Sequence, residues 1–297
     1  MNTKPIDIVV PWVNPDDENW KKDFDFWKEK ETGNKEPCRY RDWKLLRFVF
    51  RSIEDNCPWC RYVFLILSSP SQIPDWLNVN NPKLKIVYHK DYIPSEFLPT
   101  FNSNVIELFY PNIKELSDNF ILINDDMFFW NKKDETFFFE NDTPVMKPAY
   151  VYYGSNRHQW EITCQNSLNL SNEILGKKSV SLGFPGHIPV SYNKMLCSFI
   201  LYKIKNKISK IFKHSKFRQN NNIMHFLYCD IHLFTKRFIC NNEYRGQIVG
   251  LLGKDFTFND KSPLMCFNEG ELTTEKNMID LLKILTKKFN KISSFEK

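Results

Sequence analysis

The residues best placed to do chemistry follow a short apolar run near the middle of the chain. Phe120 to Ile123 are apolar, and Asn124, Asp125 and Asp126 come directly after them. Such a run predicts a buried strand, and open α/β sheets bind ligands just beyond the carboxyl ends of their strands. Two adjacent carboxylates there suit a divalent cation, Mg²⁺ or Mn²⁺, that bridges to substrate phosphates.

A second polar cluster precedes this run and strengthens that interpretation. Asn and Asp are common turn residues, so the three polar residues alone would indicate only a strand-to-turn junction. Residues 98–107 add Asn102, Ser103 and Glu107 within the same stretch of chain. Glu107 lies one turn beyond Ser103 on a predicted helix, and this spacing allows it to face the same cleft. Glu107 is then a base or a second metal ligand, or else an exposed helix carboxylate.

Alternating strands and helices must position these side chains. Hydrophobic periodicity predicts strands over 6–13, 62–67, 84–88 and 120–123, and helices over 17–30, 43–56 and 102–116. This order predicts an α/β, Rossmann-like fold, in which a mostly parallel sheet carries helices on both faces. Polar residues follow every predicted strand, at Asn14, 68–69, 89–91 and 124–126, which predicts a site along one sheet edge.

The second half of the chain is less regular. Residues 130–153 are rich in aromatic side chains and predict strands, 165–175 predict a helix, and 183–189 predict a loop. We therefore divide the chain into an α/β half, 1–130, and a mixed half, 131–297, which folds over the site to complete one catalytic unit.

Composition and cysteine usage place the chain among globular proteins. The 297 residues carry a net charge of +6, which fits anionic substrates, an acidic membrane surface or nucleic acid. The start of the chain lacks signal-peptide features, and no apolar run approaches the roughly 20 residues of a membrane span. A cytoplasmic location with reduced thiols is therefore expected. Cys57 and Cys60 form a single CxxC, which we interpret as a helix-ending turn rather than a redox or zinc motif.

Residues 192–212 predict a basic amphipathic helix. Lysines alternate with apolar residues that include Leu196, Ile200, Ile204 and Ile208. Such a helix could lie on an anionic membrane surface, giving peripheral contact at the inner membrane face. The alternative is a packed helix with a solvated lysine face.

Four separated blocks of sequence carry a family resemblance. The blocks are 6–14, with IDIVVPWVN; 39–128, which runs from RYRD through LPTFNS to NDDMF; 172–218, with GHIP and FR; and 266–296, with CFNE and a terminal FE. The sequence resembles the Stealth family, the hexose-1-phosphate transferases of bacterial capsule synthesis. These are relatives of the catalytic subunit of animal N-acetylglucosamine-1-phosphotransferase. Asn222 and Glu269 stand where the family usually has Asp.

The resemblance implies transfer of a sugar-1-phosphate from a nucleotide sugar, typically UDP-linked, to a hydroxyl of a polysaccharide or lipid-linked glycan acceptor. The attack occurs at the sugar-proximal phosphorus, a phosphodiester forms, and a nucleoside monophosphate leaves. Residues 1–130 would then bind the nucleotide sugar. This reaction needs a metal, positive charge beside the phosphoryl group, and a base for the acceptor hydroxyl.

The resemblance also assigns roles to individual residues. His187 is favoured as an acid or base by the GHIP match, and Arg218 as a phosphate clamp because guanidinium binds phosphate bidentately. The predicted catalytic residues are Glu107, Asp126, His187 and Arg218; the predicted substrate contacts are Asp7, Asn14, Asn102, Ser103 and Asn124; the predicted metal ligands are Asp125 and Asp126. Asp91 and Glu269 are weaker candidates.

Two other functions remain open at this point. A metal-dependent glycosyltransferase could use the paired carboxylates to transfer the sugar itself and release UDP. A non-catalytic glycan- or nucleic-acid-binding protein could use the basic surface. Buried strands that end in carboxylates argue against nucleic acid as a partner, because carboxylates repel phosphate unless a metal lies between them.

Overall fold

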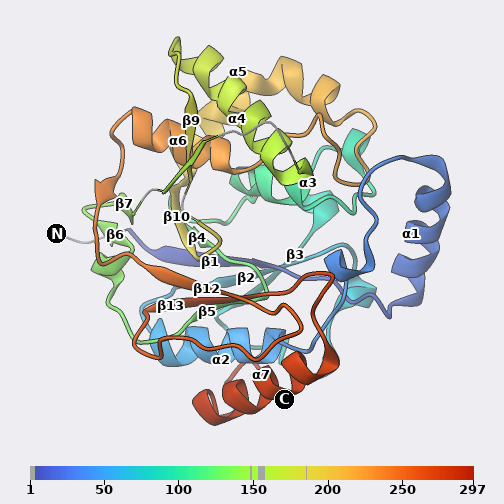
Figure 1. Ribbon diagram of the computed structural model, residues 1–297, viewed down its shortest axis with the longest axis vertical. Helices are drawn as coiled ribbons and strands as arrows, with labels where there is room; N and C mark the ends of the chain where they lie inside the picture. Colours follow the sequence, from blue (N-terminus) through green and yellow to red (C-terminus); the bar gives the residue numbers. More distant parts are fainter. Residues whose placement is uncertain (1–3, 148, 153–157, 185) are drawn as a thin grey trace.

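A five-stranded sheet forms the centre of the molecule (Figure 1). The computed structural model describes residues 4–147, 149–152, 158–184 and 186–297. Four strands run parallel, β1 (Ile6–Pro11), β2 (Val63–Leu67), β3 (Leu84–Tyr88) and β4 (Asn119–Leu122), and β10 (Val190–Asn193) pairs antiparallel with β4. The order β10-β4-β1-β2-β3 confirms the predicted Rossmann-like α/β fold.

Side chains of the central strands alternate between two hydrophobic cores. In β2, Val63 and Leu65 enter the core beside α2 (Leu46–Asn56) and α7 (Glu275–Lys288), whereas Phe64 and Ile66 enter the opposite core. That second core also contains residues of α3 (Ser103–Leu108), α5 (Lys194–Phe212) and α6 (Phe226–Phe234). This alternation follows from the two-residue period of a strand. Helices therefore cover both faces of the sheet, as predicted (Figure 1).

Several predicted helices have different bounds in the structure, and two of the differences have a clear local cause. The helix expected over 102–116 ends as α3 at Leu108, and a 3₁₀ turn (Tyr110–Asn112) containing Pro111 follows, because proline has no N–H to continue an α-helix. The helix expected from residue 192 begins as α5 at Lys194, since the two preceding residues belong to β10. Asn193 caps it by accepting a hydrogen bond from the N–H of Leu196.

The CxxC motif lies at a helix end, as predicted. Helix α2 ends at Asn56, and the N–H of Cys57 donates to the carbonyl of Ile53. Burial raises the pKa of the Cys57 thiol well above its usual value and raises that of Cys60 as well. Both thiols are therefore poor nucleophiles.

The second half adds small sheets and helices around the central one. The stretch 130–153, predicted to be strand-rich, contains β6 (Phe139–Glu140), β7 (Thr143–Met146) and β8 (Ala149–Tyr152), whereas β5 (Met127–Phe129) precedes it. The loop expected over 183–189 begins within β9 (Ser181–Phe184), and residue 185 lies outside the described residues. Helix α1 (Glu18–Lys30) and helix α4 (Gln159–Leu175), which starts earlier than predicted, complete the main helices, and β11 (Ile239–Cys240) pairs with β7.

One of these sheets brings the end of the chain to the site. Strand β13 (Leu264–Asn268) pairs antiparallel with β5 and parallel with β12 (Gly246–Gly250). Because β5 begins directly after Asp126, this pairing places Cys266 and Glu269 near the carboxylates that follow β4. The division at residue 130 stays a prediction, although β10 of the second half joins the sheet of the first.

Candidate active site

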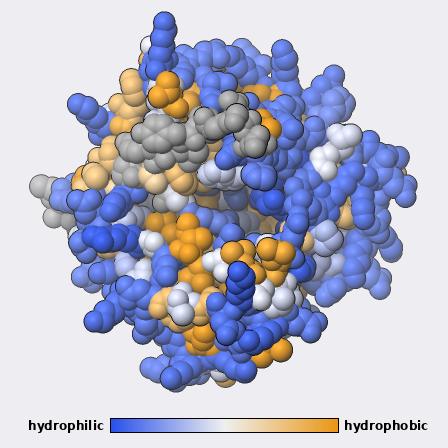
Figure 2. All heavy atoms as spheres, in the orientation of Figure 1, coloured by the Kyte–Doolittle hydropathy of each residue, from blue (hydrophilic) through white to orange (hydrophobic). Residues whose placement is uncertain are grey.

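A cavity of about 380 Å³ opens at the carboxyl ends of the parallel strands. Residues that follow all four strands line it, namely Trp12 after β1, Ser68 after β2, His89 after β3 and Asn124 to Asp126 after β4. Figure 2 shows a hollow near the centre of a largely hydrophilic face of the molecule. This edge of the sheet is where the sequence predicted a site.

Seven of the predicted site residues line this one cavity. They are Ser103, Glu107, Asn124, Asp125, Asp126, His187 and Arg218. They come from α3, the turn after β4, the loop before β10 and the loop after α5, which are separated by up to 115 residues of chain. The fold therefore brings the candidate acidic and basic side chains and Arg218 together in one cavity, as the predicted reaction requires. Their individual roles stay predictions.

Asp126 lies between a histidine and a cysteine. Its Oδ1 is 4.0 Å from His187 Nε2, and its Oδ2 accepts a hydrogen bond of 3.4 Å from Cys266 Sγ. The amide nitrogen of Asn124 lies 3.3 Å from the same histidine nitrogen. Within the described part of the chain, Asp126 Oδ1 and Asn124 Oδ1 are buried and have no hydrogen-bond partner. Unpaired buried acceptors are costly, and a bound cation would satisfy them.

Asp125 adds a second carboxyl group to this end of the cavity. Burial raises its pKa well above the usual value, and the negative charges of Asp126 and Asp42 raise it further. Crowded carboxyl groups of this kind either hold a proton or bind a cation, because ionising them together in a confined space is unfavourable. Asp125 and Asp126 thus fit a metal site, and Asp126, His187 and Cys266 form a group of donor atoms that could hold an ion.

Glu107, which is buried, and Arg218, which is partly exposed, line another part of the cavity. Burial raises the pKa of Glu107 to about 7; Arg218 opposes this rise and Asp126 adds to it. Burial also lowers the pKa of Arg218 from its usual value, but a guanidinium stays protonated in proteins. Arg218 donates a hydrogen bond from Nη2 to the hydroxyl of Ser103, one turn before Glu107. Glu107 Oε2 also lies 3.6 Å from the neutral His225.

Asn102 does not line the cavity, so its predicted contact with substrate stays a prediction, and its side chain bonds within the fold. It is fully buried, and its amide nitrogen donates to the carbonyls of Ser215 and Phe217, each at 3.1 Å, and to Asn222 Oδ1 at 2.7 Å. Its own Oδ1 accepts from the N–H of Asn104 and caps α3. Asn102 therefore fastens the segment that carries Arg218 to the start of the helix that carries Glu107.

Asp7, Asn14 and Asp91 also lie outside the cavity. Asp7 is fully buried in β1, where its carboxylate accepts hydrogen bonds from Arg61 and from the N–H of Ser117 at 2.7 Å. The side-chain oxygen of Asn14 accepts a hydrogen bond from the N–H of Asp16, and the carboxylate of the exposed Asp91 accepts one from the N–H of Tyr88. The carboxylate of Asp7 is therefore used within the fold and does not reach the cavity, whereas the substrate contact of Asn14 stays a prediction.

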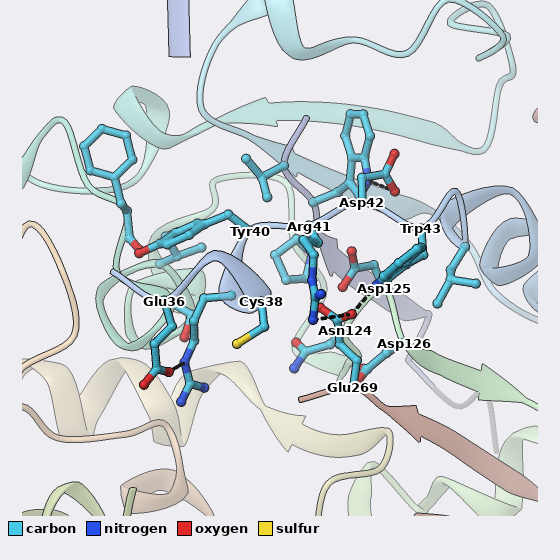
Figure 3. A pocket seen from close by; sticks show the side chains of 18 of the residues that line it. Glu36, Cys38, Tyr40, Arg41, Asp42, Trp43, Asn124, Asp125, Asp126 and Glu269 are labelled. Atoms are coloured by element: carbon cyan, nitrogen blue, oxygen red, sulfur yellow. Dashed lines mark hydrogen bonds and ion pairs between the residues drawn. The ribbon is translucent and has the colours of Figure 1, made fainter. Parts of the chain in front are cut away.

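Residues 36–43 form a wall of the cavity that was not predicted from the sequence. Figure 3 shows Arg41 and Trp43 directed toward Glu269, which follows β13. Arg41 Nη2 lies 3.5 Å from Glu269 Oε2 and donates to the carbonyl of Gly270 at 3.0 Å, and Trp43 donates to Glu269. Burial raises the pKa of Glu269, which these two partners oppose. The available signal was the pair of arginines, Arg39 and Arg41, among aromatic residues.

Comparison with known proteins agrees with this arrangement. Residues 39–146 match the family model "Stealth protein CR2, conserved region 2". The capsular polysaccharide phosphotransferase WcwK of Streptococcus pneumoniae is 32% identical to this chain over 100% of this chain and 99% of the relative. The chain belongs to the Stealth family. This confirms the predicted family and, with it, the predicted class of enzyme, a phosphotransferase.

Other similarities are more distant. The exopolysaccharide phosphotransferase cps2G of Lactiplantibacillus plantarum is 26% identical over 89% of this chain and 87% of the relative. The apo form of the glycosyltransferase GlyE of Streptococcus pneumoniae TIGR4 is similar over 99% of this chain and 65% of that chain, with 12% identity and a TM-score of 0.40. A structural likeness this distant carries no argument about function.

Proposed function

We propose that this Stealth protein transfers a sugar-1-phosphate from a UDP-type nucleotide sugar to a hydroxyl of a glycan acceptor in capsular or cell-surface polysaccharide synthesis. The observation that carries this proposal is a single cavity that combines Asp125 and Asp126 with Arg218 and two candidate bases. Small-molecule sites enclose roughly 300–1,000 Å³, and this cavity lies within that range. The names of the relatives support the same reaction class.

Asp125 and Asp126 would hold the cation, Mg²⁺ or Mn²⁺. The support is the unpaired Oδ1 of Asp126 and the raised pKa of Asp125, both of which a bound cation would relieve. When bound, the cation neutralises the charge of the diphosphate. Without it, two carboxylates would repel that anion.

Arg218 would bind the phosphoryl oxygens. Its guanidinium is fixed by Ser103, and its carbonyl accepts from the N–H of Asn34 at 2.8 Å and from Gln159 at 3.0 Å. A guanidinium that is held in place before the reaction stabilises the negative charge that develops on the phosphoryl group, and it does so without having to move. Arg39 and Arg41 line the same cavity and add positive charge.

Glu107 or His187 would accept the proton of the acceptor hydroxyl. A new bond forms between the acceptor oxygen and the sugar-proximal phosphorus, while the bond from that phosphorus to the bridging oxygen breaks. The nucleoside monophosphate leaves with the bridging oxygen, and the proton passes to the base. Glu107 is buried with a pKa of about 7, whereas His187 is partly exposed beside Asp126.

The deciding experiment scores the nucleotide that is released. The full chain is incubated with a panel of UDP-sugars, Mg²⁺ and a glycan acceptor. We expect UMP, and EDTA should abolish its release until Mg²⁺ or Mn²⁺ is restored. Release of UDP would instead indicate transfer of the sugar, and full activity in metal-free buffer would contradict the metal assignment.

A variant of Asp126 tests the role of the carboxylate directly. Asp126→Asn should lower the rate by ~100-fold or more, the effect of removing one electrostatic contact to the transition state. Asp75→Asn is the matched control, because Asp75 is exposed and does not line the cavity. Equal activity of the two variants would exclude Asp126 from the reaction.

A further inference from the structure

Cys266 is a buried thiol for which the proposed reaction has no use. It lies in β13 beneath the cavity, is completely buried, and donates to Asp126 Oδ2. Donor atoms of Asp126, His187 and Cys266 all lie within 4.8 Å of one another. We propose that these three side chains form a site for a thiophilic divalent cation of the Zn²⁺ type, distinct from the hard cation that the reaction would use.

The distance between the donor atoms of Cys266 and Asp126 agrees with tetrahedral coordination. With zinc bonds of about 2.0–2.3 Å, the edges of the tetrahedron measure roughly 3.3–3.6 Å. The Sγ–Oδ2 distance between Cys266 and Asp126 is 3.4 Å, so this edge already has the required length. The His187 Nε2 atom is 4.0 Å from Asp126 Oδ1 and must approach slightly. Its side chain is 39% exposed and can rotate toward the carboxylate.

The backbone fixes two of the three ligands. Cys266 pairs with Met127 in the β13–β5 ladder, and the N–H of Phe267 donates to the carbonyl of Asp126 at 3.0 Å. The separation of Asp126 and Cys266 is therefore set by a strand pair rather than by flexible side chains. Asp126 and His187 line the cavity, whereas Cys266 does not, so an ion held by all three has its open position toward the cavity. Three protein ligands with one open position is the usual arrangement of an accessible zinc site.

The donor set separates this site from the Mg²⁺ site by chemistry. Thiolate and imidazole select Zn²⁺ and its neighbours, whereas Mg²⁺ prefers oxygen donors. On binding, a metal–sulfur bond forms and the thiol proton passes to solvent. Asp126 belongs to both donor sets, so the two ions exclude each other. A Zn²⁺-type ion should therefore inhibit turnover supported by Mg²⁺.

The test uses Co²⁺ as a probe and needs no substrate. Co²⁺ bound to a thiolate gives a charge-transfer absorption in the near ultraviolet, so titration of the full chain should produce this band with one equivalent. Zn²⁺ should displace Co²⁺ and remove the band. A large excess of Mg²⁺ should only weaken the band, because Mg²⁺ competes for Asp126, the ligand that the two sites share. Cys266→Ser should abolish it, and His187→Ala should weaken Co²⁺ binding by at least ~10-fold.

Matched variants exclude the other thiols. Cys240→Ser removes an exposed cysteine, and Cys60→Ser removes one member of the CxxC pair; both should keep the band. A band that survives Cys266→Ser, or that disappears in Cys60→Ser, overturns the proposal. His187→Ala changes only a partly exposed side chain and keeps the test decisive if Cys266→Ser does not fold. Binding of Co²⁺ by a chain that releases no UMP would leave this site standing while refuting the proposed function.

Discussion

Burial raises the pKa of Glu107 to about 7, and this value sets the expected pH dependence of the reaction. A base must be unprotonated to act, so kcat/KM should rise with pH through a midpoint near 7 and level off above it. Glu107→Gln should lower kcat by ~100-fold or more and remove this limb from the residual activity. The exposed Glu140, changed to Gln, is the control. A fully active Glu107→Gln enzyme with an unchanged limb would assign the base to His187.

Asp7 should matter for stability rather than for turnover. Asp7→Ala leaves Arg61 and the N–H groups of Tyr62 and Ser117 without their acceptor. Each buried donor left unpaired costs ~1–3 kcal/mol, and Arg61 partly reaches water, so we expect a loss of about 2–4 kcal/mol. Urea unfolding measures this loss, and kcat/KM measured well below the unfolding transition should change little. A stable but inactive Asp7→Ala protein would restore the role in substrate binding.

The difference between Asp126 and Asp7 explains which residues the sequence could identify. Asp126 follows a strongly apolar run, so its place at a sheet edge is a local property of the sequence. The function of Asp7 depends on Ser117, which is 110 residues away, and that of Asn102 on Asn222, which is 120 residues away. A single sequence carries no signal for such pairings, so two buried structural polar residues were interpreted as ligand contacts.

The same contrast between local and long-range signals applies to the strands. The third strand was predicted over 84–88 and is observed there, because a short run that contains the β-branched Ile86 and Val87 and is bounded by polar residues is a strong local signal. The sheet of β12, β13 and β5 was not predicted, since its three- to five-residue strands have no clear period and β13 pairs with β5 across more than a hundred residues. This sheet delivers Cys266 and Glu269 to the site, so the missed sheet is also the reason why Cys266 was missed and why Glu269 was only a weaker candidate.

Gly33 tests how the loop after α1 positions Arg218. Its φ is +123°, and an added Cβ would lie 2.8 Å from Phe217 Cβ and 2.9 Å from the carbonyl oxygen of Arg218. Gly33→Ala should displace the arginine and lower kcat/KM by ~10–100-fold, the cost of a displacement of about 1 Å at a reacting centre. Gly176→Ala is the control, because Gly176 also has positive φ (+61°) but nothing lies within 4 Å. Equal losses of kcat/KM in both variants would show that the effect comes from backbone strain at a positive φ and not from displacement of Arg218.

At the scale of the whole molecule, helix α5 packs into the core. Its apolar residues Leu196, Ile200, Ile204 and Ile208 are buried, which agrees with the alternative of a packed helix, whereas membrane contact stays a prediction. The opposite face carries an exposed stripe of Met195, Phe199 and Tyr202, at the i, i+4, i+7 spacing of one helix face. Among the residues that the structure describes, no helix is long and apolar enough to cross a membrane.

The exposed stripe on α5 makes peripheral membrane contact a sharper prediction. Lys203 lies over the ring of Phe199 at 5.2 Å, and Lys205 over that of Tyr202 at 4.3 Å, so apolar groups and positive charge occupy one surface. Such a surface suits an anionic bilayer, and the chain is basic overall with a net charge of +6.

We expect the protein to float with anionic vesicles at low salt, but not with neutral ones. Changing the three stripe residues, Met195, Phe199 and Tyr202, to Ser should abolish flotation, whereas Ile292→Ser, at a residue 72% exposed elsewhere, should not. Flotation that survives the triple change would place the membrane contact on another surface. If the unchanged protein does not float with anionic vesicles at low salt, the predicted membrane contact is refuted.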